Sequence, residues 1–312
     1  MPFEPPYPVI FDRLQQGKVV PFLGAGASIV GRLDAEEWSR TAAFPPRGAE
    51  LSRMLAQKAA FASVSADPQD LTDLLKVAAY YEQSSGRDAL RDELHSVLAR
   101  PFAPGPLHRL LASIDGLHLI VTTNYDTLLE RAFTEANRPF DLVVYPKDSD
   151  QSGSCVLHWP AGAAEPRTLS PDDLQVDLEQ TTVIFKMHGT IDDRSAPRPL
   201  YDNFVITEDD YIEFLSRMTS GTAVPKTFLR YFRGRSFLFL GYSLADWNMR
   251  VVLRNLGREF EAQSQRGGAT KHWAIQQQPS AVEQWLWGSR GVNVYDQRIE
   301  EFVGRLEGKV HG

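Results

Sequence analysis

Four short strings hold the polar and glycine residues that are best placed for chemistry, and they lie far apart in the chain. They are Gly24-Ala25-Gly26-Ala27-Ser28, Thr122-Thr123-Asn124-Tyr125-Asp126, His188-Gly189 and Gly241-Tyr242-Ser243. Three of them directly follow an apolar run typical of a buried strand, and the histidine follows such a run after two residues. Because the carboxyl ends of parallel strands meet at one crevice of an open α/β sheet, this arrangement predicts a single nucleotide site.

The first string has the composition of a phosphate-binding turn between a strand and a helix. Glycines let the backbone approach a pyrophosphate closely, and a helix N-terminus attracts anions. Ser28 adds a hydroxyl donor. The usual dinucleotide fingerprint is incomplete, because no third glycine stands in its place and no acidic residue clearly ends a second strand. A tight turn without a ligand therefore stays open as the alternative.

The second and third strings offer an amide and an imidazole. Asn124 both donates and accepts hydrogen bonds, which suits a ribose hydroxyl or a water molecule. The alternative makes Thr123 or Asn124 a helix cap. His188 stands at a strand end beside a glycine, and the ordinary pKa of an imidazole suits general base catalysis near neutral pH. A partly buried structural histidine is the alternative.

The fourth string repeats the strand-turn-helix design. We expect Gly241 and Ser243 to contact the nucleotide from the opposite side of the crevice. A serine hydrolase of the nucleophile-elbow type needs the pattern Gly-x-Ser-x-Gly. Position 245 is Ala, which excludes that class of enzyme.

The elements that must position these strings alternate between strands and helices. The patterns predict strands at 19–23, 117–121, 142–145, 182–187, 236–240, 273–276 and 292–295. They predict helices at 125–136, 208–217, 222–232, 244–256, 281–287 and 298–307, and a loop at 146–180. Such alternation predicts an α/β fold with a Rossmann-like, doubly wound parallel sheet.

Residues 31–115 interrupt that alternation with a mostly helical pattern. Apolar residues at three- and four-residue spacing predict helices at 49–61, 69–81 and 87–98. We therefore expect an inserted helical subdomain at 31–115, within a frame formed by 17–30 and 116–312.

Composition restricts the class of protein further. The chain has 312 residues, 43% of them hydrophobic, and a formal net charge of −7, which fits a globular protein and argues against a nucleic-acid-binding surface. The single cysteine, Cys155, excludes an intrachain disulfide and a cysteine-rich zinc site. Since the sequence shows neither a secretory leader nor a membrane-length apolar run, we expect a cytoplasmic protein.

Together and in this order, the four strings resemble the sirtuin family. They match its dinucleotide loop, its Asn/Asp motif, its catalytic histidine and its ribose-side loop. Protein-deacylating sirtuins carry a four-cysteine zinc module, which one cysteine excludes here, and a residue pair other than Tyr125-Asp126 follows their asparagine. The Thr-Thr-Asn-Tyr-Asp form and the helical insertion are more similar to the sirtuin-like domains of bacterial anti-phage defence systems, which cleave NAD+.

This resemblance implies a single sirtuin-like domain over 1–312, without a zinc module, that cleaves NAD+ to nicotinamide and ADP-ribose. It implies that Asn124 orients the nicotinamide-side ribose and the attacking water, and that His188 is the general base. The cofactor-binding residues that it implies are Gly24, Ala25, Gly26, Ser28, Thr123, Asp126, Gly241 and Ser243.

The resemblance also bears on partners. NAD+ is the expected substrate, with no metal. Control is expected from self-association or from a separate partner, such as an ATPase or an Argonaute-like protein, without nucleic-acid or membrane contacts. Two other functions stay open: an NAD-dependent protein deacylase or ADP-ribosyltransferase, and a non-catalytic scaffold that binds NAD or ADP-ribose.

Overall fold

The computed structural model describes residues 4–33, 35–65, 67–147, 155–192, 201–242 and 272–310. Two sheets are present in these ranges. The larger contains β1 (Val19–Leu23), β2 (Leu119–Thr122), β3 (Phe140–Val144), β4 (Val156–Trp159), β5 (Arg167–Leu169), β6 (Thr182–Lys186), β9 (Ser236–Leu240), β10 (His272–Gln276) and β11 (Val292–Asp296). The smaller pairs β7 (Gly189–Thr190) with β8 (Asn203–Phe204).

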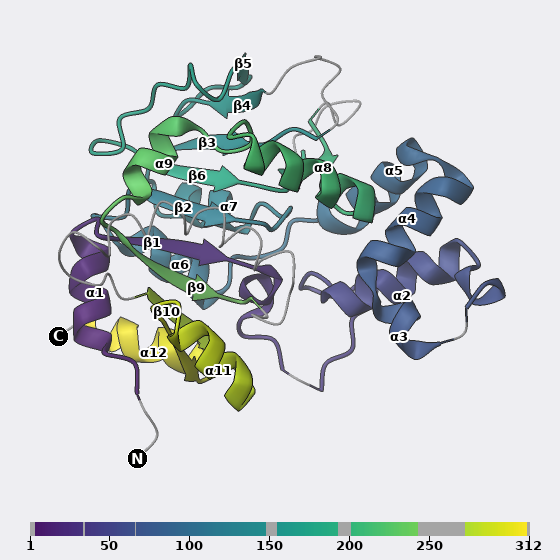
Figure 1. The fold of residues 1–312 in the computed structure, drawn as a ribbon, viewed down its shortest axis with the longest axis horizontal. Helices are drawn as coiled ribbons and strands as arrows, with labels where there is room; N and C mark the ends of the chain where they lie inside the picture. Colours follow the sequence, from purple (N-terminus) through teal and green to yellow (C-terminus); the bar gives the residue numbers. More distant parts are fainter. Residues whose placement is uncertain are drawn as a thin grey trace.

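The larger sheet has the strand order β11-β10-β9-β1-β2-β6-β3-β4-β5 (Figure 1). Every neighbouring pair from β11 to β3 is parallel, and β4 and β5 add an antiparallel edge. The predicted parallel α/β sheet is therefore confirmed. The loop predicted at 146–180 is wrong in part, because the short strands β4 and β5 lie within it.

The helices surround this sheet and also form a separate group. They are α1 (Tyr7–Gln15), the short 3₁₀ helix η1 (Ala25–Ile29), α2 (Gly48–Lys58), α3 (Pro68–Thr72), α4 (Leu74–Ser85), α5 (Arg87–Leu98), α6 (Pro106–Ser113), α7 (Leu128–Glu135), α8 (Glu208–Thr219), α9 (Lys226–Phe232), α11 (Ala281–Gly288) and α12 (Ile299–Val310). The helix predicted at 244–256 lies outside the described residues.

Side chains of the central strands alternate between two apolar cores, as the pleat of a strand requires. In β1, Val19 and Leu23 join the core that contains residues of α1, α6, α7 and α12. Val20 and Phe22 join the opposite core, which contains residues of α8, α9 and α11. Helices therefore cover both faces of the sheet, and the doubly wound arrangement is confirmed.

Helices α2, α4 and α5 form a third core, beside the sheet (Figure 1). Ile191, Phe204 and Ile206 belong to the same cluster, and Tyr125 packs against it. Although α6 lies within 31–115, it packs on the sheet with β1 and β2. The proposed division into a frame and an insertion stays a prediction, because the core of α2, α4 and α5 also includes residues beyond 31–115.

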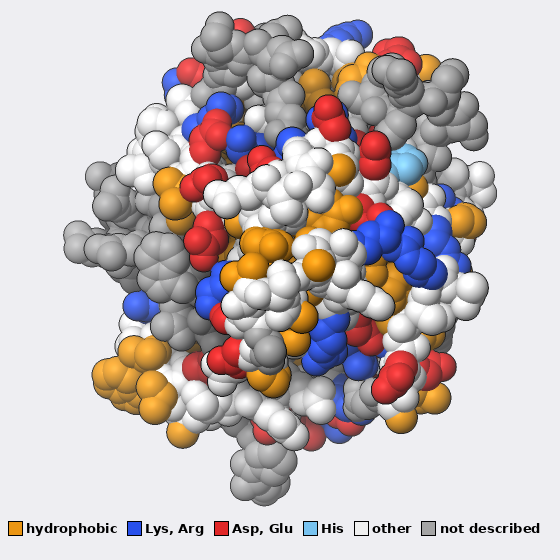
Figure 2. Space-filling view, turned by 90° about the vertical axis from the view of Figure 1, so that its right-hand side faces the viewer, with side chains coloured by type: hydrophobic (Ala, Val, Ile, Leu, Met, Phe, Trp, Pro, Cys, Tyr) orange, Lys and Arg blue, Asp and Glu red, His pale blue; other side chains and the backbone are white. Residues whose placement is uncertain are grey.

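Figure 2 shows the side of the molecule on which this helical group lies. Acidic and basic side chains are interspersed there with small apolar groups. No helix in the described part of the chain is long and apolar enough to cross a membrane.

Candidate active site

Strand register brings the four strings to the same edge of the sheet. Leu23 at the end of β1 pairs with Leu240 of β9 on one side and with Thr122 of β2 on the other. Thr122 in turn pairs with Lys186 of β6. The strings that follow these strands therefore begin at neighbouring positions, as the sequence predicts.

A hydrogen-bonded cluster joins the first two strings. The Asn124 side-chain amide donates to the Gly24 carbonyl at 3.0 Å and to Ser28 Oγ at 2.8 Å. Ser28 Oγ donates to Asp126 Oδ2 at 2.6 Å. Three residues that the resemblance assigns to NAD+ thus lie in direct contact, although they come from loops about a hundred positions apart.

The helix-cap alternative for Thr123 and Asn124 is wrong. Helix α7 begins at Leu128, and Asp126 Oδ1 accepts the hydrogen bond from the Leu128 amide at 3.1 Å. The Thr123 hydroxyl lies 3.1 Å from the Tyr242 hydroxyl, and neither atom caps a helix. Asn124 is therefore left for the cluster with Ser28.

The glycines of the first and fourth strings pack directly against each other. The Gly26 amide donates to the Gly241 carbonyl at 3.0 Å, and the Gly24 amide donates to the Leu240 carbonyl at 2.9 Å. A Cβ on Gly24 would stand 2.7 Å from the Gly241 oxygen and from the Tyr242 ring. Gly241 has φ +77°, and a Cβ there would lie 2.3 Å from the Ala27 nitrogen. Close approach of two loops thus requires these glycines, independently of any phosphate.

His188 is buried two residues after the end of β6, with 5% of its surface exposed. Its ring packs edge-on against Tyr211 and Phe214 of α8, each at 5.0 Å between ring centres. Its Nδ1 lies 3.3 Å from the Tyr211 hydroxyl, while its buried Nε2 has no hydrogen-bond partner among the described residues. Burial lowers the pKa of His188 to about 3. The expectation of a pKa near neutrality is therefore wrong, because the apolar surroundings disfavour the imidazolium.

A buried lysine lies beneath the Asn124 loop. Lys186 Nζ donates to the Tyr125 carbonyl at 3.0 Å, to the Asp126 carbonyl and to Glu130 Oε1 at 2.9 Å. The Lys186 side chain is fully buried and that of Glu130 is 12% exposed. Burial raises the pKa of Glu130, and the Lys186 charge opposes that shift. This ion pair fixes the backbone of the two residues that follow Asn124.

A pocket of about 320 Å³ opens beside the interlocked glycine loops. Gly26, Gly241 and Tyr242 of the glycine loops line it. It is also lined by Arg32 and Arg47 and by residues at or just after the ends of β10 and β11, among them Gln276, Gln277, Gln297 and Arg298. Since the pocket lies at the carboxyl edge of the sheet, it is where an open α/β fold places a ligand.

The predicted site residues thus fall into separate groups. Ser28, Asn124 and Asp126 form the hydrogen-bonded cluster, Gly26 and Gly241 line the pocket, and Ala25 is exposed at the start of η1. Gly24 is buried beneath Tyr242, and Ser243 lies outside the described residues. No group of three or more His, Cys, Asp or Glu side chains within the described ranges is arranged to hold a metal ion.

Sequence reasoning missed two tyrosines. Tyr211 contacts the His188 ring, and its only signal was its spacing of three residues from the buried Phe214. The Tyr242 hydroxyl donates to the Leu23 carbonyl at 2.8 Å and meets Thr123. Tyr242 stands inside the fourth string, so its position alone was a usable signal.

Comparison with known families shows which family the chain belongs to. The model of the SIR2-like domain matches residues 118–295, more than half of the chain. The chain belongs to this family. The match includes Asn124, Asp126, His188 and Gly241, whereas β1 and the first glycine string precede it.

Three relatives extend the SIR2-like assignment. The chain is 30% identical over 211 residues to an NAD(+) hydrolase ThsA of Acinetobacter baumannii, an alignment that covers 65% of this chain and 34% of the relative. It is 28% identical over 195 residues to an NAD(+) hydrolase ThsA of Enterococcus faecium, covering 62% and 34%. It is 23% identical over 274 residues to the defense-associated sirtuin 2 of Bacillus subtilis, covering 88% and 22%. The chain thus aligns with only about a third or less of each relative.

Proposed function

We propose that this chain is an NAD+ glycohydrolase that cleaves NAD+ to nicotinamide and ADP-ribose, as an effector of bacterial anti-phage defence. The observation that carries the proposal is the Ser28–Asn124–Asp126 cluster, which joins two distant strings at the carboxyl edge of the sheet. His188 follows the adjacent strand. The names of the ThsA relatives support NAD+ as the substrate.

In the proposed reaction, the bond between ribose C1′ and the nicotinamide nitrogen breaks. Its electron pair leaves with nicotinamide, which becomes neutral, so no acid needs to protonate the leaving group. Water attacks C1′ as positive charge develops on the ribose, as in glycoside cleavage. Asn124 orients that ribose and the water, and the proton of the water passes to His188.

Burial of His188 is compatible with this role. With a pKa of about 3, the imidazole stays neutral at physiological pH and keeps a lone pair for a proton, although it is a weaker base than an ordinary imidazole. In this role Nε2, which is buried and lacks a partner among the described residues, must become accessible to a hydroxyl or water when the substrate binds. A buried polar atom without a partner is costly, so this contact also favours binding.

The pocket beside the glycine loops suits the adenosine half of the substrate. Its amide side chains, Gln276, Gln277 and Gln297, both donate and accept hydrogen bonds, as an adenine edge and ribose hydroxyls require. Gly26 and Gly241 line the same pocket, and Gly26 lies two residues before Ser28 of the cluster. The pyrophosphate would then lie over the first glycine string.

Control of such an enzyme is part of the proposal. Unrestrained cleavage of NAD+ would deplete the cell's own cofactor, so we infer regulation by self-association or by a separate partner, such as an ATPase or Argonaute-like protein. We place the protein in the cytoplasm, where NAD+ is available. An isolated chain that is both monomeric and fully active would argue against this part of the proposal.

The test is to incubate the purified protein with NAD+ and to separate nicotinamide and ADP-ribose by chromatography, with and without the product of a neighbouring gene. Asn124→Ala and His188→Ala should lose activity, the latter by roughly 100-fold or more, which is typical for loss of a general base. His118→Ala is the matched control, because His118 is half-buried before β2 at the opposite edge of the sheet.

Equal amounts of both products from the wild type and from the control variant, lost in the two site variants, would establish the activity and its site. NAD+ binding without product would favour a scaffold. Turnover that depends on an acyl peptide would favour a deacylase.

A further inference from the structure

Residues 203–207 begin with β8, which pairs with β7. They contact both the loop that contains Asn124 and the loop that contains His188. In the small sheet, Gly189 pairs with Phe204, and the Val205 amide donates to the His188 carbonyl at 2.9 Å. This hydrogen bond fixes the backbone of His188 itself. The segment therefore holds the histidine by its main chain.

Tyr125 connects the Asn124 loop to the same segment. Its hydroxyl donates to the Val205 carbonyl at 2.6 Å, and its ring packs edge-on against Phe204 at 5.2 Å between centres. Burial raises the pKa of Tyr125 well above its usual value, so the hydroxyl stays a donor. Val205 thus accepts from Tyr125 with its carbonyl and donates to His188 with its amide.

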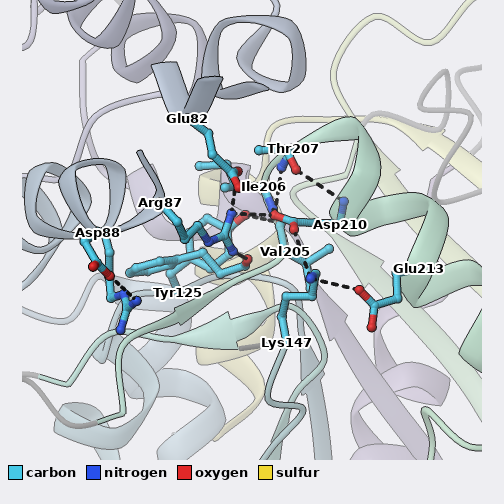
Figure 3. A network of polar contacts seen from close by, with 12 residues as sticks. Glu82, Arg87, Asp88, Tyr125, Lys147, Val205, Ile206, Thr207, Asp210 and Glu213 are labelled. Atoms are coloured by element: carbon cyan, nitrogen blue, oxygen red, sulfur yellow. Dashed lines mark hydrogen bonds and ion pairs between the residues drawn. The ribbon is translucent and has the colours of Figure 1, made fainter. Parts of the chain in front are cut away.

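An arginine of the helical group contacts this segment directly. Arg87, the first residue of α5, donates to the Phe204 carbonyl at 2.6 Å, to Asp210 Oδ2 at 3.0 Å and to Glu82 at 3.1 Å (Figure 3). Only 19% of the Arg87 side chain is exposed. The planar guanidinium can bind several acceptors at once, which an ammonium group does less well.

Asp210 carries this contact into helix α8. Its Oδ2 accepts from the Ile206 and Thr207 amides, each at 3.0 Å, at the start of the helix. Although burial opposes the shift, the Ile206 amide and the Arg87 charge lower the pKa of Asp210, which stays ionised. Since Tyr211 is the next residue, this anchor also fixes the side chain that contacts His188.

We propose that Arg87 is a positioning residue for NAD+ cleavage, acting from the helical group on His188 and on the Asn124 loop. The inference rests on the proposed function of that site. Arg87 fixes the 203–207 segment directly and α8 through Asp210, and these two elements hold His188 from its backbone and its side chain. Loss of Arg87 therefore misplaces the reacting groups without removing any of them.

The test compares Arg87→Gln and Arg87→Lys with the control Arg91→Gln. Arg91 lies one turn further along α5 and pairs at 2.7 Å with Asp88, whose side chain is 90% exposed. We expect Arg87→Gln to lower kcat by ~10-fold or more, as small misplacements of reacting groups do, with KM for NAD+ within about 3-fold. Arg87→Lys should be intermediate, and Arg91→Gln should match the wild type.

A second readout does not depend on activity. Amide hydrogen exchange should rise around 122–128 and 188–191 in Arg87→Gln and stay unchanged in Arg91→Gln. If the wild type cleaves no NAD+, the proposed function fails while this readout still decides the positioning role. Wild-type exchange in both loops, or a wild-type kcat, would overturn the inference. If Arg87→Gln does not fold, Arg87→Lys is judged by the same two measurements.

Discussion

The buried pair of Lys186 and Glu130 gives the sharpest prediction on stability. In Lys186→Met, the apolar side chain fills much of the same volume but leaves the Glu130 carboxylate without its cation. The Asp126 carbonyl also loses the donor that Lys186 supplies, whereas the Tyr125 carbonyl keeps the Ile191 amide at 2.9 Å. We therefore expect one uncompensated charge and one unpaired carbonyl beneath the active-site loop.

These contacts determine how much stability the variant should lose. Removing one partner of a buried ion pair costs about 3–5 kcal/mol. Because the Glu130 side chain is 12% exposed, water reaches it in part, and we expect the lower end, about 3 kcal/mol. The double variant Lys186→Met/Glu130→Gln removes the stranded charge and leaves mainly the unpaired carbonyl, at about 1–2 kcal/mol.

The assay is urea unfolding followed by tryptophan fluorescence. The single variant should be less stable than the double variant by about 1–2 kcal/mol at pH 8, the difference between the two estimates above. The raised pKa of Glu130 means that the folded state binds its proton more tightly than the unfolded state does. Lowering the pH from 8 toward 5 should therefore reduce the difference in the free energy of unfolding between the single and the double variant. A double variant as unstable as the single one, or a difference that is independent of pH, would refute the reasoning.

Two further predictions concern the glycine loops and the histidine. Gly241→Ala should destabilise the protein more than Gly221→Ala does in the same unfolding assay. Both glycines have φ near +77°, but only at Gly241 would the added Cβ meet neighbouring atoms. Gly221→Ala therefore measures the backbone strain alone, about 1–2 kcal/mol. Equal losses would mean that the loops do not interlock. The pKa of His188, about 3, lies below its unfolded value, so stability should fall as pH drops through 6.5 toward 3. His188→Asn should lose less stability than the wild type over that range. Part of the pH dependence should remain, because the pKa values of His108 and His272 are also lowered. A slope of stability against pH equal to that of the wild type would contradict the lowered pKa of His188.

Long apolar runs made the central sheet predictable. The strands at 19–23 and 236–240 are buried at every position, so their continuous apolar sequence identified them with correct bounds. Strands β4 and β5 were missed because they are short, and β5 is an edge strand whose largely exposed residues carry a weak pattern. The helix predicted at 69–81 is two helices, since the Asp73 carboxylate accepts from the Leu75 and Lys76 amides and starts a new one.

The candidate site was predictable in location but not in detail. The rule that loops at strand ends converge was enough to bring Ser28 and Asn124 together. It gave no information on burial, and burial is what removes His188 from the neutral pKa range. Nor could local sequence reveal that Gly24 faces Gly241, because that contact joins loops more than two hundred residues apart.

The place of β1 in the sheet affects how the chain is synthesised. β1 is made before β9, one of its two neighbouring strands, which follows more than two hundred residues later. Until then, a fully buried apolar strand has an unpaired edge, which is a template for aggregation.

The same position of β1 in the sheet limits how far the chain can be truncated. A fragment that begins at residue 118 would lack the strand between β2 and β9, and its sheet would be open at the centre.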